Sequence, residues 1–145
     1  MTPEQKDLVR ESWALVLPIA DDAAALFYGR LFEIDPATRP LFAAVRPEEQ
    51  RRKLMLALDA AVRGLDQLDA LVPVIEALGR RHVGYGVTEA QYDSVGAALL
   101  WTLENGLGAA WTPATAEAWA AAYALLSGVM RGAARELAAP AQAAA

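Results

Sequence analysis

The stretch Pro73-Val-Ile-Glu-Ala-Leu-Gly-Arg-Arg-His82-Val-Gly-Tyr-Gly-Val87 contains the only histidine of the chain. Read as a helix that starts at Pro73, it places Ile75, Leu78 and His82 on one apolar stripe, at positions i, i+3 and i+7. The two arginines before the histidine then point toward water, and the glycines after it end the helix. A lone histidine on an apolar stripe is usually a hydrogen-bonded core residue, so its role depends on the rest of the chain.

The composition favours a single all-helical domain. The chain has 145 residues, of which 55% are hydrophobic, and a mean hydropathy of +0.20. That is enough apolar surface for one core and for the lining of a cofactor pocket. Alanine is abundant and strand signals are nearly missing. We expect residues 1–138 to form the domain and residues 139–145 to form a frayed tail.

Charge, cysteine content and hydropathy disfavour several classes of function. A net charge of −5 and an isoelectric point of about 4.8 argue against nucleic acid as a partner. The absence of cysteine excludes disulfides and thiolate chemistry. Charged residues interrupt every apolar run before it reaches the length of a membrane span, and no apolar signal segment follows the N-terminus. We therefore expect a cytoplasmic protein without a membrane span.

Helix signals recur along the whole chain. Thr2 begins a capping box with Gln5, Asp21 or Asp22 offers a cap to a second helix, and Thr88 opens another capping box. Helices are expected from residue 3 to about 17, from 21 or 22 to about 34, from 47 to before 64, from 73 to about 84, from 88 to about 105 and from 112 onward, with a short turn-like element at 35–42 and a bridge at 64–71. The residues expected to face inward are Val9, Trp13, Val16, Ala24, Phe27, Tyr28, Leu31, Gln50, Leu54, Ala57 or Leu58, Ala61, Leu65, Tyr92, Val95, Leu99, Leu103, Trp119, Ala122, Tyr123, Leu126 and Met130.

Three positions on these helices are unusual for their surroundings. Tyr28 faces inward, and a buried hydroxyl needs a partner, which in an ordinary core is a backbone carbonyl. Gln50 lies one turn before Leu54 on the same face, although a glutamine near a helix start is more often exposed to solvent. Gly96 weakens its helix, and we expect it to mark a close approach to another backbone.

The order and spacing of these motifs resemble the globin family over residues 2–130. The resemblance is closest to bacterial single-domain haemoglobins and to the globin half of flavohaemoglobins, particularly those with a Tyr/Gln pair on the ligand side. The stretch from Leu78 to His82 also resembles neuroglobin, whose second haem-ligating histidine has no counterpart here. The matching residues are Phe27-Tyr28-x-x-Leu31-Phe32-x-x-x-Pro36-x-x-x-Pro40-Leu41-Phe42, Gln50-x-x-x-Leu54, Leu78-Gly-Arg-Arg-His82-x-x-Tyr85-Gly-Val87 and Tyr92-x-x-Val95-Gly96.

The resemblance implies an all-α globin fold in which six to seven helices pack around haem b, iron protoporphyrin IX. His82 would be the proximal ligand of a five-coordinate iron. Its other ring nitrogen would donate to the carbonyl of Leu78 and so fix the orientation of the ring. Phe42 would stack on the macrocycle, and Tyr85 belongs to the same matching set. The apolar walls would come from Leu54, Leu58, Val87, Val95 and Leu99.

On the ligand side, the resemblance assigns Tyr28, Gln50 and Leu54. O₂ becomes partly negative on iron, and a phenol O–H and an amide N–H are both hydrogen-bond donors. Each such bond contributes roughly 1–3 kcal/mol, so two of them would slow the release of O₂ and give a high affinity.

Two further features concern the edge and the proximal side of the haem. Lys53 and Arg81 are the best candidates to bind the propionates, with Arg46 as a third, and solvated surface charge is an equally good reading of each. Tyr92 matches a tyrosine that, in flavohaemoglobin-like globins, joins a glutamate of the last helix near the proximal histidine. Here Ala134 takes that position and Glu136 would face elsewhere. This departure argues against strong peroxidase-like activation.

Four functions follow as alternatives. The first is a carrier that binds O₂, and also NO or CO, reversibly. The second is a nitric oxide dioxygenase, which would need a separate reductase because the chain has no G-x-G-x-x-G after a strand. The third is a gas sensor that acts through a partner. The fourth, a helical scaffold without haem, is disfavoured by the inward positions of His82, Tyr28 and Gln50.

Overall fold

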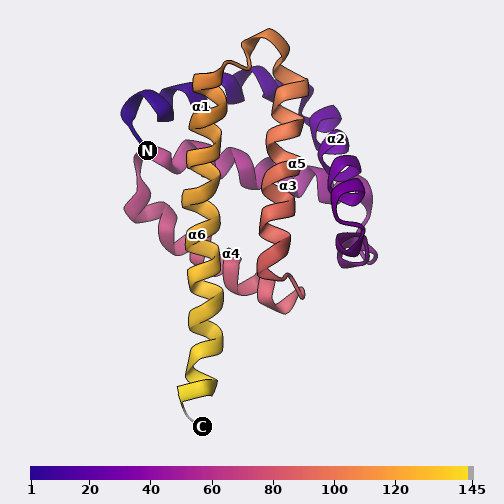
Figure 1. Cartoon of the computed structure of the whole chain (residues 1–145), viewed down its shortest axis with the longest axis vertical. Helices are drawn as coiled ribbons and strands as arrows, with labels where there is room; N and C mark the ends of the chain where they lie inside the picture. The colour runs from indigo at the N-terminus through magenta and orange to yellow at the C-terminus, as the bar shows by residue number, and fades with distance from the viewer. Residues whose placement is uncertain (144–145) are drawn as a thin grey trace.

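The computed structural model is entirely helical over the residues that it describes, which are 1–143 for the backbone and 1–137 for the side chains. Figure 1 shows the helices folded into one body. The elements are α1 (Pro3–Val16), η1 (Leu17–Ile19), α2 (Ala20–Ile34), η2 (Pro36–Phe42), α3 (Pro47–Arg63), η3 (Gly64–Asp66), α4 (Leu68–Gly84), α5 (Glu89–Leu107), η4 (Gly108–Ala110) and α6 (Pro113–Ala143), where η denotes a 3₁₀ turn.

The starts of α1 and α5 follow the predicted capping boxes. The backbone N–H of Gln5 donates to Thr2 Oγ1 at 3.1 Å, and the N–H of Thr2 donates to Gln5 Oε1 at 3.0 Å. The N–H of Thr88 likewise donates to Gln91 Oε1 at 2.8 Å. Each bond satisfies an N–H group that the helix itself leaves unpaired.

The predicted start of the second helix is wrong. α2 begins at Ala20, and Ile19 precedes it without a side-chain cap. The reason is that η1 continues directly from α1, so the chain is already helical before Asp21 is reached. Asp21 and Asp22 lie in the first turn, where their charge stabilises the helix through its dipole.

The predicted start of the fourth helix is also wrong, by five residues. α4 begins at Leu68, and Pro73 lies inside its second turn. Pro73 has no N–H to donate to the carbonyl of Asp69, so α4 lacks one backbone hydrogen bond there. The helix tolerates this loss because its packing against the rest of the protein stabilises it. The other end agrees with the prediction: α4 ends at Gly84, and Gly86 adopts a φ of +85° that favours glycine.

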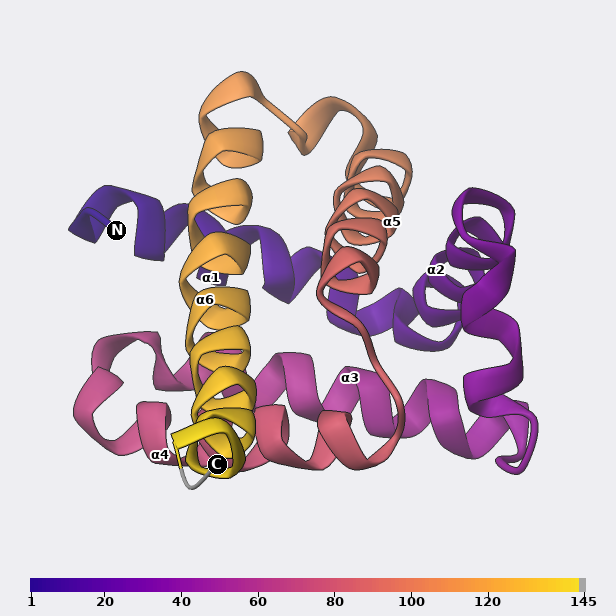
Figure 2. The ribbon, with the colours of Figure 1, turned by 60° about the horizontal axis from the view of Figure 1, so that its bottom comes forward.

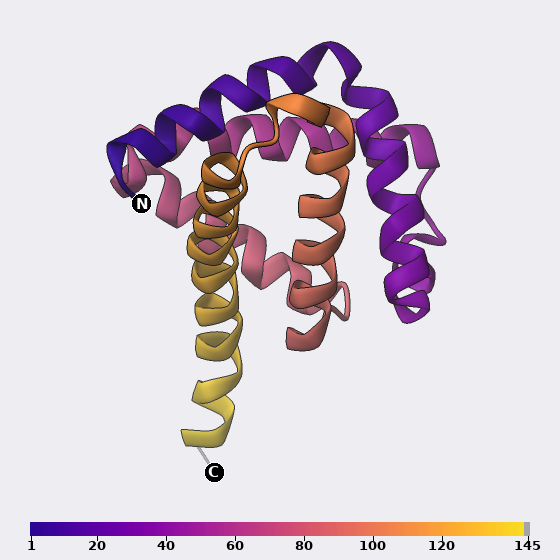
Figure 3. The same ribbon diagram turned by 45° about the horizontal axis from the view of Figure 1, so that its top comes forward.

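The core lies where α1, α2, α5 and α6 meet. α4 packs mainly on α6, α2 on α5, and α1 on α6, whereas α3 and α4 make at most marginal backbone contact with each other. Figures 1 and 2 show α5 and α6 side by side, crossing the direction of α3. Figure 3 shows α1 spanning the end of the molecule where α5 leads into α6. Trp13 and Trp119 meet in this core with ring centroids 6.1 Å apart.

Most residues predicted to face inward are buried or half-buried, with two corrections. Leu58, and not Ala57, belongs to the inner stripe of α3, because Ala57 is exposed. Gly96 approaches a side chain and not a backbone: a Cβ there would lie 2.7 Å from the ring of Tyr123. The close backbone approach occurs instead at Gly79, where a Cβ would lie 2.5 Å from the carbonyl oxygen of Met130.

Two expectations concern the ends and the apolar length of the helices. The frayed tail was predicted at 139–145. The side chains of these residues, and residues 144–145 as a whole, lie outside the described part of the chain. The backbone of α6 is helical to Ala143. None of the described helices combines the length and the apolar character needed to cross a membrane.

Candidate functional site

The imidazole of His82 is held in one tautomer by its own helix. His82 Nδ1 lies 2.8 Å from the carbonyl oxygen of Leu78, one turn earlier in α4. A carbonyl only accepts, so Nδ1 carries the proton and Nε2 keeps its lone pair. Burial lowers the pKa of His82 below its ordinary value of 6.5, and the charge of Arg81 acts in the same direction, against the Leu78 bond. His82 therefore presents a neutral nitrogen ligand at neutral pH.

Two tyrosines flank His82. The ring of Tyr85 lies 5.5 Å from the imidazole centroid but is 60% exposed, whereas the ring of Tyr92 lies 6.5 Å away and is 7% exposed. The guanidinium of Arg131 sits 5.2 Å over the Tyr92 ring and pairs with Asp93 at 2.8 Å. Among the described residues, no carboxylate is hydrogen-bonded to His82 or Tyr92. The charges beside the Tyr92 ring are thus those of the Arg131–Asp93 ion pair.

Tyr28 and Gln50 form a direct pair between α2 and α3. Gln50 Nε2 donates to the hydroxyl oxygen of Tyr28 at 3.0 Å, and both side chains are half-buried. The partner of Tyr28 is therefore a side chain and not a backbone carbonyl. Burial raises the pKa of Tyr28, an effect that the Gln50 bond partly offsets. The phenol stays protonated at neutral pH, and its O–H remains available as a donor.

An aromatic cluster fixes the ring of Tyr28. Phe42, in η2, meets it edge to face at a centroid distance of 5.3 Å, and Phe27 meets it edge to face at 5.0 Å. Phe32, one turn after Tyr28, lies 5.9 Å from Phe42. Phe32 was not among the predicted site residues, although its spacing from Tyr28 places the two on one face of α2.

The predicted apolar walls are only partly covered by protein. Leu54, Leu58, Val87 and Val95 are half-buried, and Leu99 is buried. The N–H of Val87 donates to the His82 carbonyl at 3.1 Å, which ties the segment after α4 to the imidazole. Exposed apolar surface of this kind is costly, at about 25 cal/mol per Å². A neutral nitrogen ligand, a hydroxyl–amide pair and half-buried apolar side chains are the residue types from which a haem site is built.

The cations predicted at the rim are all free of ion pairs with described residues. Lys53, Arg46 and Arg81 are exposed, and none forms a salt bridge within the part of the chain that the structure describes. Their assignment to the propionates stays a prediction.

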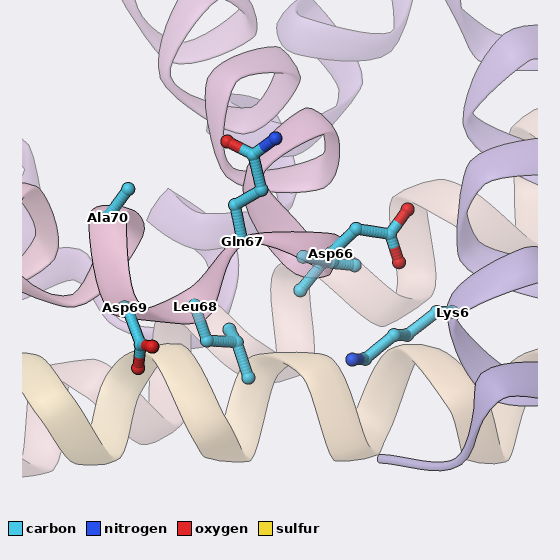
Figure 4. Close-up of a pocket in the computed structure, with 7 residues that line it drawn as sticks. Lys6, Asp66, Gln67, Leu68, Asp69 and Ala70 are labelled. Atoms are coloured by element: carbon cyan, nitrogen blue, oxygen red, sulfur yellow. The ribbon is translucent and has the colours of Figure 1, made fainter.

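Two surface pockets lie away from these residues. The larger, about 410 Å³, is shown in Figure 4, where Lys6 of α1 faces Asp66 and the start of α4. The other, about 340 Å³, lies between α5 and α6 beside Tyr123 and Arg131. Neither pocket contains His82, Tyr28 or Gln50, so it is the chemistry of these three side chains that marks the candidate site.

Comparison with known proteins identifies the family of this chain. The family model described as Globin matches residues 25–130. Neuroglobin of Danio rerio is 34% identical over 143 residues, covering 90% of each chain, and neuroglobin of Chaenocephalus aceratus is 32% identical over the same length. A bacterial globin from Campylobacter jejuni superposes with a TM-score of 0.82 at 25% identity, covering 94% of this chain and 98% of the other. A hexacoordinated heme protein from an anhydrobiotic tardigrade superposes with a TM-score of 0.83 at 22% identity, covering 93% and 96%, and so shares the fold. The chain belongs to the globin family.

Proposed function

We propose that this globin binds haem b through His82 and takes up O₂ reversibly and tightly, in the manner of the bacterial single-domain haemoglobins that its Tyr/Gln pair resembles. When bound, haem would supply a ferrous iron that takes up O₂ and gives it partial negative charge. The neutral Nε2 of His82 supports the assignment of the ligand, because Leu78 holds the proton on the other nitrogen. His82 is the only histidine, so we infer a five-coordinate iron with its sixth position left to NO, CO or O₂.

The observation that carries the proposal is the 3.0 Å bond from Gln50 to Tyr28. Because the Tyr28 oxygen already accepts from Gln50, its own proton is directed elsewhere and is ready for a ligand. The amide of Gln50 is a second donor within reach of the same place. Two donors that are positioned before the ligand arrives lose little entropy on binding it, which favours slow release.

The surroundings of His82 favour reversible binding over cleavage of the O–O bond. Leu78 offers only a carbonyl, and the ring of Tyr92 lies beneath Arg131 with no carboxylate of the described residues hydrogen-bonded to its hydroxyl. A hydrogen bond to a carboxylate would make the imidazole a stronger electron donor; a backbone carbonyl does so less. We infer storage or transport of O₂ in the cytoplasm as the primary role.

Spectra and ligand kinetics test the proposal. Purified protein with haem should give distinct absorption spectra in the ferric, ferrous and oxygenated states, and His82→Ala should lose much of its haem. Tyr28→Phe and Gln50→Leu should each release O₂ at least about tenfold faster in stopped-flow experiments, because each removes a hydrogen bond to a charged group. Gln67→Leu, at an exposed glutamine, is the control. Unchanged release in both site variants would refute the donor assignment.

The same donors would also serve nitric oxide dioxygenation, which the pairing of Tyr28 with Gln50 makes the strongest alternative. They would hold O₂ in place for reaction with NO, and a separate reductase would have to return the iron to the ferrous state. Mixing oxygenated protein with NO in the presence of a general flavin reductase and its nicotinamide distinguishes the two roles. Sustained nitrate formation indicates the enzyme, and a single round indicates carriage or sensing through a partner.

A further inference from the structure

The first two turns of α3 are attached to the rest of the protein through two neighbouring side chains. From Pro47 to Lys53, every residue is exposed except Gln50 and Arg51. Gln50 binds Tyr28, and Arg51 Nε donates to Asp21 Oδ1 at 2.9 Å. Both acceptors belong to α2. No side chain caps the start of α3, so these two are the side-chain hydrogen bonds that tie this segment to α2.

The two attachment points are well separated along α2. Asp21 and Tyr28 are seven residues apart, which places them on one face of the helix about 10 Å apart along its axis. Gln50 and Arg51, in contrast, are consecutive in α3. Two bonds that diverge from adjacent residues to distant points prevent α3 from pivoting about either one. With Gln50 alone, this segment would keep a single side-chain hydrogen bond to α2 before Leu54, the next half-buried residue.

Arg51 differs from the cation that follows it. The Arg51 side chain is 23% exposed, whereas that of Arg52 is 66% exposed and reaches only Glu49 of its own helix, at 4.0 Å. Arg51 thus lies against the protein and joins two helices. Asp21, its partner, is 75% exposed, so dissolved salt has access to this pair.

We propose that Arg51 and Asp21 are positioning residues for the distal site: their ion pair holds Gln50 within donor distance of Tyr28 and of the gas ligand. The inference rests on the proposed function of Tyr28 and Gln50. Gln50 Nε2 carries two hydrogens, so it can donate to Tyr28 and to the ligand together when α3 holds it in place. The ion pair is a second bond that keeps this part of α3 against α2, and the rate of O₂ release depends on it.

Ligand kinetics in matched variants test the proposal. Arg51→Met and Asp21→Asn should each release O₂ roughly two- to fivefold faster, which is the range expected from the loss of a partly exposed ion pair. Arg51→Lys should restore part of the wild-type rate, because a lysine keeps the charge but not the planar geometry. Arg52→Met and Asp22→Asn are the controls, and they should release O₂ at the wild-type rate.

Ionic strength provides a second kinetic test. Raising salt from about 0.02 M to about 0.5 M shortens the screening length severalfold and weakens exposed pairs. Release of O₂ from the wild type should therefore accelerate with salt, while Arg51→Met should show no such dependence. Equal salt dependence in the two proteins would overturn the role of the pair.

Hydrogen exchange in the haem-free protein gives a readout that is independent of gas binding. Backbone amides of residues 50–54 should exchange faster in Arg51→Met than in Arg52→Met, while those of α6 stay unchanged. In the carbon monoxide complex, the infrared C–O stretch should show a second population in Arg51→Met, in which Gln50 no longer faces the ligand.

The outcomes separate this inference from the function on which it rests. If Tyr28→Phe speeds release but Arg51→Met behaves as Arg52→Met does, the positioning role is wrong and the proposed function stands. If Tyr28→Phe has no effect either, the proposed function itself fails. Unchanged amide exchange in Arg51→Met would show that the ion pair does not hold α3, whatever the kinetics.

Discussion

His82 is the only side chain of this protein whose ordinary pKa lies near neutral pH, because the chain has one histidine and no cysteine. Its burial lowers that pKa in the folded state. The neutral form is therefore favoured by folding, and the unfolded chain takes up a proton first as the pH falls. The same effect keeps Nε2 available as a ligand under mildly acidic conditions.

We predict that acidification destabilises the haem-free protein through this one residue. The free energy of unfolding should be insensitive to pH above the ordinary histidine value of 6.5 and should fall as the pH decreases below it, toward the lowered folded value. Urea unfolding between about pH 7.5 and about pH 5.5 measures this, since carboxylates titrate below that range. A His82→Leu variant should lose the dependence; if it does not, another group is responsible.

At the residue scale, helical spacing was enough to predict the inward positions of His82 and Tyr28 and the bond from His82 to the Leu78 carbonyl, because all of these are local to one helix. The direct bond between Tyr28 and Gln50 was not predicted, since it depends on how two helices cross. The role of Arg51 was missed for a related reason. In the sequence, it is one of three consecutive cations, and nothing local distinguishes the one that faces α2.

At the scale of elements, α4 determines where the imidazole lies. It rests on α6 through Gly79, three residues before His82, where the Met130 backbone leaves no room for a Cβ. The predicted start of α4 at Pro73 was wrong. Other prolines of this chain stand at the first position of a helix, whereas Pro73 lies inside one. A proline near a helix start is compatible with both positions, and only the packing of the first turn selects one.

Adding a methyl group at Gly79 should force α4 away from α6. We predict that Gly79→Ala lowers the free energy of unfolding by about 1–3 kcal/mol, because the obstacle is backbone and cannot rotate aside. Gly128→Ala, inside α6, meets nothing within 4 Å and should raise stability by up to about 1 kcal/mol. Denaturant unfolding of the two variants provides the comparison, and equal effects would contradict the close contact.

At the scale of the whole molecule, Leu54, Leu58, Val87 and Val95 are only half-buried, which is what the proposed haem site would require before a cofactor covers them. The globin fold was predictable because the matching motifs occur in a fixed order along nearly the whole chain, and order survives errors of a few residues in helix boundaries. The contacts between α3 and its neighbours were not predictable, because they join residues that are distant in sequence.

Haem should therefore stabilise the entire fold. We predict that adding ferric haem raises the thermal unfolding midpoint, since a ligand present at a thousandfold excess over its dissociation constant contributes about 4 kcal/mol. The shift should be much smaller in His82→Ala. Circular dichroism at increasing temperature, with and without haem, measures it; an equal shift in the variant would mean that His82 does not hold the iron.

The near absence of contact between α3 and α4 has a consequence for how such a protein can change over generations. α4, which carries the proposed iron ligand, packs on α6, and α3, which carries the proposed amide donor, packs on α2. Substitutions that change the lifetime of the bound gas can accumulate where α3 contacts α2 without weakening the binding of haem by α4. Selection can thus act on the two traits separately.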